Sequence, residues 1–151
     1  MSDALVPLGG AIHGDTHILT TRVYYEDTDF SGVVYHASYL RFMERGRTDF
    51  VRCLGVDQGD LYRKAQEELG SGFAFVVRAM QIEFLRPARM DDILTIETRT
   101  IDVRGATLTN AQRVLRGTEV LVEAKVRVAF VAGGKPSRIP DALRAMMVPA
   151  T

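Results

Sequence analysis

The stretch YEDTDFSGVVYH at residues 25–36 carries the strongest information about the fold and chemistry of this chain. It follows a β-branched and aromatic segment, residues 17–25, that predicts a strand. Its Asp-x-Asp and Ser-Gly pairs predict a turn. Apolar residues at three- and four-residue steps then predict a helix from about Ala37 to Leu54. The turn therefore places a carboxylate just before a helix N-terminus, where backbone N–H groups attract negative charge.

Working outward, the rest of the chain reads mainly as strands. A short helical segment is expected over residues 57–68 and another over 140–147, on either side of four long strands at 73–85, 93–104, 106–116 and 120–130. The long helix should bury one stripe, formed by Leu40, Met43, Arg47, Phe50, Val51 and Leu54. Gly46 within this helix favours a close approach of helix to sheet. One helix packed on a meander predicts a two-layer α+β domain over residues 17–132, with a flexible arm at 1–16 and a tail at 133–151.

Composition excludes several classes of protein. Nineteen Lys and Arg balance nineteen Asp and Glu in 151 residues, which argues against a nucleic-acid binder that relies on bulk charge. The single cysteine, Cys53, excludes an intrachain disulfide and is compatible with a reducing cytoplasm. The first sixteen residues lack the pattern of a signal peptide, and no apolar run approaches the roughly 18 residues of a transmembrane helix.

The two aspartates of the turn permit a structural and a chemical interpretation. Aspartate before glycine is common in turns because its side chain binds nearby backbone amides, and we prefer this structural role for Asp27. Asp29 could instead act on an acyl carbonyl beside the helix N-terminus. A calcium loop is excluded because Ser38 stands where the bidentate glutamate should be. Three scattered histidines and one cysteine give poor support for zinc, and no Gly-x-Ser-x-Gly elbow is present.

The motif at 24–39 also carries a resemblance to a known family, which segments 39–48, 75–78, 86–92 and 104–105 extend. Residues 18–132 resemble the hotdog-fold 4-hydroxybenzoyl-CoA thioesterase family, most nearly its Tol-Pal-associated acyl-CoA thioesterase branch. The resemblance implies a long antiparallel sheet wrapped around one central helix. It further implies hydrolysis of acyl-CoA to free acid and CoA without a cofactor, in a homodimer or homotetramer whose active sites lie between subunits.

The same resemblance implies roles for individual residues. Asp29 corresponds to the catalytic carboxylate, as nucleophile or general base, and the backbone N–H of His36 corresponds to the oxyanion donor. Phe30 replaces the small residue common at its position. The expected substrate-binding residues are Gly32, Tyr35, Glu44, Phe75, Val77 and Arg104. Their alternative roles are structural: a turn or core position, an ion pair of Glu44 with Arg41, Arg45 or Arg47, and a solvated hairpin arginine at 104.

Two other functions stay open from the sequence. A hotdog hydratase or dehydratase would need a histidine and an acid on opposite sides of the substrate, and His36 with Glu44 is the obvious pair. A non-catalytic acyl-thioester-binding scaffold at a cell-envelope complex is the third. Acyl carrier protein is an alternative thiol carrier to CoA. We expect a cytoplasmic protein, with the inner face of the membrane as an alternative site, and no nucleic acid partner.

Overall fold

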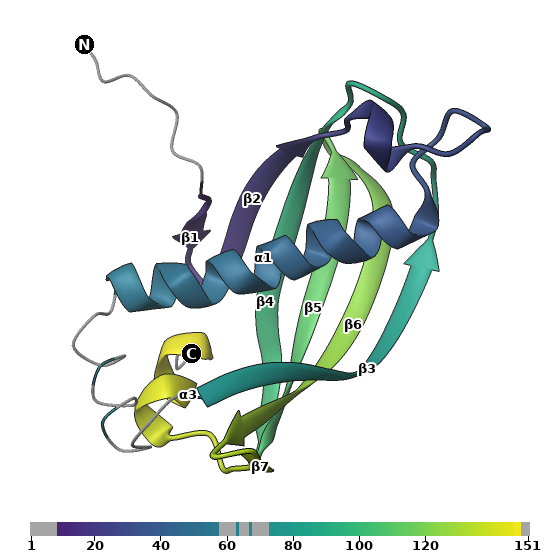
Figure 1. The fold of residues 1–151 in the computed structure, drawn as a ribbon. Helices are drawn as coiled ribbons and strands as arrows, with labels where there is room; N and C mark the ends of the chain where they lie inside the picture. Colours follow the sequence, from purple (N-terminus) through teal and green to yellow (C-terminus); the bar gives the residue numbers. More distant parts are fainter. Residues whose placement is uncertain (1–8, 58–62, 64–66, 68–72, 149–151) are drawn as a thin grey trace.

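A computed structural model describes residues 9–57, 63, 67 and 73–148 of the chain. An antiparallel sheet curves around the long helix α1, His36–Asp57 (Figure 1). The strands are β1 Ala11–His13, β2 Thr16–Arg22, β3 Phe73–Phe84, β4 Ile93–Arg104, β5 Thr107–Arg116, β6 Glu119–Ala132 and β7 Lys135–Pro136. A 3-10 turn η1, Tyr25–Asp27, precedes α1, and a short helix α3, Asp141–Met147, follows the sheet. The expected α+β fold is confirmed.

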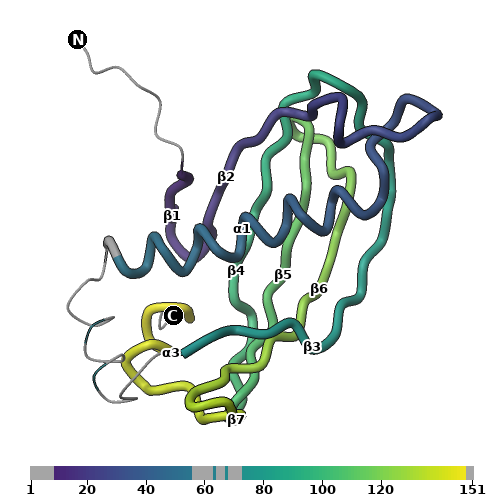
Figure 2. Tube along the Cα trace, viewed as in Figure 1, coloured from purple at the N-terminus to yellow at the C-terminus, as the bar shows by residue number. Residues whose placement is uncertain are grey.

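The strand order places β3 at one edge of the sheet and β1 at the other. The path is β1-β2-β4-β5-β6-β3, with β7 paired to β6, and every pairing is antiparallel. Figure 2 shows the trace of these strands bending around α1. This is the hotdog arrangement, in which one sheet face holds the helix. β3 is also irregular, because its register shifts at Arg78, between Val77 and Ala79.

Helix α1 buries a wider arc than the expected stripe. Met43, Phe50 and Leu54 are buried as predicted. Tyr39 and Phe42 are buried as well, whereas Leu40 is exposed, so its place in the stripe was wrong. The physical reason is the curvature of the sheet, which contacts more than one narrow line of side chains along the helix.

The helix lies close to the sheet at Gly46, as its sequence position predicted. A Cβ there would lie 2.8 Å from Ile96 Cγ2 and 3.0 Å from Thr98 Oγ1, so a larger residue does not fit. Directly below, the buried Gln112 side chain donates to the Met43 carbonyl at 2.9 Å. These contacts fix the height and rotation of α1 over the sheet.

Three predictions about the flanking segments have different outcomes. Residues 11–13 were expected in a flexible arm, but they form β1 and pair with β2. The helix expected at 57–68 falls almost wholly outside the described residues. The tail helix is confirmed as α3, whose Leu143, Met146 and Met147 join the main hydrophobic core. Among the helices described here, none is both long and apolar enough to cross a membrane.

Candidate active site

The loop between β2 and α1 places Asp29 at the first position of a tight turn, with Phe30 and Ser31 at its tip. Gly32 donates its N–H to the Asp29 carbonyl at 3.0 Å, and Asp29 donates its own to the Val33 carbonyl at 3.0 Å. Gly32 has a φ of 85°, a conformation that favours glycine. The chain thus makes a tight turn after Asp29 and leads through two valines directly to the start of α1.

Asp29 is exposed, and one of its oxygens is held in place. Its Oδ1 accepts the Ser31 N–H at 2.8 Å and the Ser31 hydroxyl at 2.5 Å. The hydroxyl hydrogen bond is the main reason that the pKa of Asp29 lies below its ordinary value, followed by the backbone N–H. The carboxylate is therefore ionised at neutral pH. Its Oδ2 has no hydrogen bond to the described part of the chain.

Asp27, two residues earlier, has the structural role that we preferred. It is buried, and its Oδ2 accepts the Tyr24 N–H at 2.8 Å. Its carbonyl accepts the Tyr35 N–H at 2.9 Å and the Ser38 hydroxyl at 3.0 Å. The buried Asp27 therefore ties the loop to the first turn of α1.

The N-terminus of α1 lies beside the Asp29 turn with open hydrogen-bond donors. Among the described residues, neither the His36 N–H nor the Ala37 N–H donates to any group. His36 is close enough that its charge contributes to the lowered pKa of Asp29. The His36 ring packs 4.4 Å from the Tyr35 ring and 6.2 Å from the Phe84 ring, centroid to centroid. A hollow of about 210 Å³ opens there, between the helix start and the end of β3.

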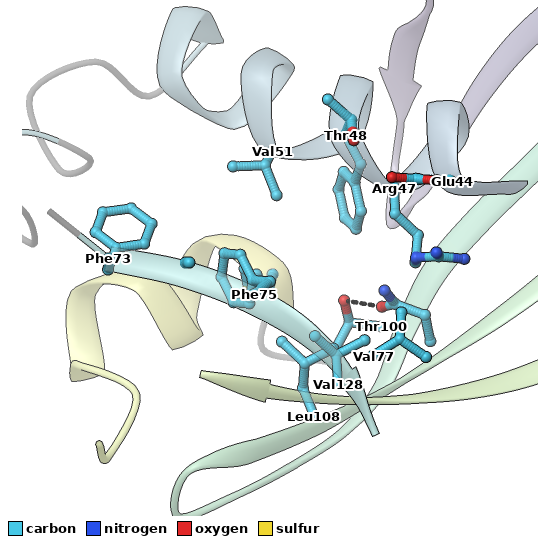
Figure 3. Close-up of a pocket in the computed structure, with 14 residues that line it drawn as sticks. Glu44, Arg47, Thr48, Val51, Phe73, Phe75, Val77, Thr100, Leu108 and Val128 are labelled. Carbon is cyan, nitrogen blue, oxygen red and sulfur yellow. Dashed lines mark hydrogen bonds between the residues drawn. The ribbon is translucent and has the colours of Figure 1, made fainter. Parts of the chain in front are cut away.

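A larger cavity of about 320 Å³ lies under the second half of α1 (Figure 3). Three of the expected substrate residues, Glu44, Phe75 and Val77, line it. Apolar side chains from β3, β5, β6 and α3 supply most of its wall. Its polar groups include Arg47 and a buried pair in which the Thr100 hydroxyl donates to Asn110 Oδ1 at 2.9 Å. The cavity has the shape and chemistry of a site for a largely apolar ligand.

One protomer does not bring all of the predicted site residues together. Asp29, Gly32, Tyr35 and His36 share one end of the molecule. The first residue of β4, Ile93, pairs with Arg22 just before the Asp29 loop. Arg104 is the last residue of β4, about 35 Å farther along the strand. It forms an exposed ion pair of 2.9 Å with Asp102. Within a single chain, Arg104 therefore has the alternative role of a solvated hairpin residue.

Glu44 is separated from His36 by eight residues of helix, or about 12 Å. The pair that a hydratase would need is thus not assembled within one protomer. Glu44 is exposed, and the expected ion pair with Arg41, Arg45 or Arg47 is absent among the described residues. Its charge nevertheless acts on Arg47, since it opposes the lowering of the Arg47 pKa by burial.

A cluster of polar side chains elsewhere in the molecule consists of His17, Asp49 and Cys53. Their candidate ligand atoms lie within 4.8 Å of one another, a spacing that could hold a metal ion. Asp49 is already saturated, however. Its Oδ2 accepts the Gly10 N–H at 2.7 Å and bonds His17 Nε2 at 2.7 Å, and its Oδ1 pairs with Arg52. Since these donors occupy the carboxylate, we interpret the cluster as a clamp that holds β1 and β2 to α1.

Sequence reasoning missed three residues of these sites. Ser31 was not among the predicted site residues, although it anchors Asp29. Arg47 was placed in the buried stripe, and Asn110 was not singled out. Asn110 and Gln112 alternate with outward-facing residues on the same face of β5 as Leu108 and Val114. This period of two was the available signal, because a buried amide needs a hydrogen-bond partner.

Comparison with known proteins agrees with this arrangement. Residues 23–147 match the family described as "Thioesterase-like superfamily". The chain is 44% identical over 126 residues to "Acyl-CoA thioesterase YbgC" of Haemophilus influenzae, covering 82% of this chain and 88% of that one. It is 42% identical over 125 residues to "Acyl-CoA thioester hydrolase YbgC" of Escherichia coli O157:H7, covering 81% and 88%. A solved "Probable Thioesterase" from Bartonella henselae superposes with a TM-score of 0.69 at 45% identity, covering 84% and 100%.

Proposed function

This chain belongs to the thioesterase-like superfamily, and from that premise we propose that it hydrolyses acyl-CoA thioesters to a free acid and CoA. The observation that carries the proposal is the pairing of an ionised carboxylate, Asp29, with an open helix N-terminus at His36. Thioester hydrolysis needs a nucleophile or base together with donors for the oxyanion, and these two features supply them.

Asp29 would act through its Oδ2, which has no hydrogen bond in the described chain. As a general base, it takes a proton from water, whose oxygen then bonds to the thioester carbon. As a nucleophile, Oδ2 bonds to that carbon itself and gives an acyl anhydride, which water hydrolyses in a second step. In both routes the C–S bond breaks and the CoA sulfur leaves as thiolate, which a proton neutralises.

The oxyanion of the tetrahedral intermediate would bind the N–H groups of His36 and Ala37. Both are free of acceptors in the described chain and lie at the positive end of the α1 dipole. Loss of one such donor in other enzymes costs about 3 to 4 kcal/mol of transition-state stabilisation. Because the donors belong to the backbone, side-chain replacement at His36 should disturb packing against Tyr35 and Phe84 more than the oxyanion site itself.

The functional unit that we propose is a dimer joined through β3. This strand is at the edge of the sheet that the described residues form. Aromatic side chains around the Asp29 loop are exposed in one protomer, Phe30 by 108% and Tyr25 by 81%. If two copies of β3 pair antiparallel about their centre, the Phe84 end of one strand meets the Phe73 end of the other. Because His36 packs near Phe84, His36 of the partner subunit would then lie beside the cavity under α1.

The test replaces Asp29 by asparagine and measures thiol release from a panel of acyl-CoA substrates. We expect kcat to fall by about 100- to 10,000-fold, which is the usual contribution of a positioned general base. The matched control is Glu26→Gln, which removes an exposed acid three residues away in the same loop. Retention of most activity in Asp29→Asn, or an equal loss in Glu26→Gln, would reject the assignment of Asp29.

A further inference from the structure

The cavity under α1 contains a charged group that is only partly satisfied. Arg47 extends from the helix across the cavity toward Thr100, as Figure 3 shows. Of its five N–H donors, those at Nη1 bond Gln112 Oε1 at 2.9 Å, and no described carboxylate forms an ion pair with it. Burial lowers the pKa of Arg47, which means that the site disfavours the isolated cation. Arg47 is half-buried, and guanidinium groups that are withdrawn from water are normally paired with anions.

The rest of the cavity suits an acyl chain. Phe50, Phe73 and Phe75 form an aromatic wall, and Leu108 and Val128 line the floor. The polar groups Arg47 and Thr100 lie on the same side of the cavity in Figure 3, and Thr100 is bonded to Asn110. A ligand that fits both halves has an apolar body and an anionic end.

We propose that this cavity binds acyl chains that end in a carboxylate, and that Arg47 selects them by pairing with the distal carboxylate. The inference rests on the proposed thioesterase function and adds a substrate class, the CoA esters of dicarboxylic acids. In the proposed dimer, the thioester would lie at Asp29 of the partner subunit and the acyl chain would enter past Phe73 and Phe75. Glu44, on the same side of α1, opposes the anion and sets the strength of the preference.

Matched substrate pairs test the preference directly. The pairs are butyryl- and succinyl-CoA, hexanoyl- and adipoyl-CoA, and octanoyl- and suberoyl-CoA, scored as the ratio of kcat/KM within each pair. In at least one pair we expect the dicarboxylic substrate to be favoured by about tenfold, the size of a charge-assisted hydrogen bond. Preference for the plain hydrocarbon chain in all three pairs would overturn the proposal.

Two replacements that remove charges of opposite sign test whether charge causes the preference for dicarboxylic substrates. Arg47→Met should lower the dicarboxylic-to-monocarboxylic ratio by about tenfold, and Arg47→Lys should restore part of it. Glu44→Gln, at an exposed position, should raise the ratio because it removes the opposing charge. The control is Arg45→Met, which removes an arginine that lies over the Phe42 ring on the same helix. A ratio that responds equally to Arg45→Met and Arg47→Met, or falls in Glu44→Gln, contradicts the proposal.

Binding of non-hydrolysable thioethers separates this inference from the proposed reaction. S-hexyl-CoA and S-(ω-carboxypentyl)-CoA are titrated calorimetrically into the full-length protein. Tighter binding of the carboxylated thioether, lost in Arg47→Met, supports the cavity assignment even if no acyl-CoA is hydrolysed, in which case only the proposed reaction fails. Turnover of acyl-CoA without any discrimination between the thioethers rejects the cavity assignment and leaves the thioesterase function standing.

Discussion

Asp49, in the second half of α1, and Asp29, in the loop before α1, differ in a way that separates a structural carboxylate from the one that we propose as catalytic. Asp49 is buried and receives hydrogen bonds from Gly10, His17 and Arg52. Asp29 is exposed, and within the described chain both hydrogen bonds to its side chain come from Ser31 to one oxygen. Both carboxyl groups have a lowered pKa, so the pKa alone does not separate them. The difference is the oxygen of Asp29 that is left without a donor.

The largest effect on this contrast should come from Asp49→Asn. The change leaves His17 and the Gly10 N–H facing an amide instead of an anion, and breaking a buried pair costs about 3 kcal/mol or more of unfolding free energy. Urea unfolding followed by circular dichroism measures the loss. Activity per folded molecule should stay close to wild type, in contrast to Asp29→Asn. Asp15→Asn, an exposed acid, serves as control and should change stability little.

The pH dependence of that stability difference is the next effect in size. Burial by itself would raise the pKa of Asp49, but its hydrogen bonds from Arg52, Gly10 and His17 outweigh burial and lower it to about 2. Because the folded pKa lies below the unfolded value, the contribution is fully present above about pH 4 and is lost as the pH falls toward 2, a change of about 2 kcal/mol.

Urea unfolding of wild type and Asp49→Asn at a series of pH values measures this effect. The two curves of unfolding free energy against pH should converge on the acid side. Parallel curves across the whole range would show that the pKa of Asp49 is the same in the folded and the unfolded protein, and would contradict this prediction.

A smaller effect is expected from Ser31→Ala at the other carboxylate. Removal of the hydroxyl takes one of the two donors from Asp29 Oδ1 and lets the pKa of Asp29 rise toward its ordinary value. The acidic limb of the kcat/KM profile against pH should therefore move to higher pH, with a several-fold loss of kcat from the looser side chain. Ser31→Thr should restore both properties. A profile that stays in place would show that Ser31 serves only the turn.

The contrast also explains which parts of the molecule were predictable from sequence. The Asp29 loop and the strand at Ile93–Arg104 follow from local signals, turn residues and apolar alternation, and both were placed correctly. The clamp at Asp49 joins His17 to a residue 32 positions away, and His17 was not among the predicted site residues. No local pattern encodes that contact, since it exists only after β2 and α1 have packed.

The residues that line the proposed acyl-binding cavity were harder to predict from sequence for a related reason. Phe75 and Val77 were expected to line an acyl slot, and they do line a cavity, but it lies under the second half of α1 rather than beside Asp29 of the same chain. In the dimer that we propose, the curvature of the sheet and the edge position of β3 would decide which chain completes which groove. The spacing of residues within one strand predicts neither the curvature of the sheet nor the position of β3 at its edge.

The contact between Gly10 and Asp49 has a practical consequence for handling the protein. Gly10 has no room for a side chain, because a Cβ there would lie 1.9 Å from the Ile18 carbonyl oxygen, and its amide supports the buried acid. Trimming the N-terminus for crystallisation should therefore stop before Gly9. A protease site or affinity tag fused directly to residue 11 would expose Asp49 to water and destabilise the C-terminal half of α1.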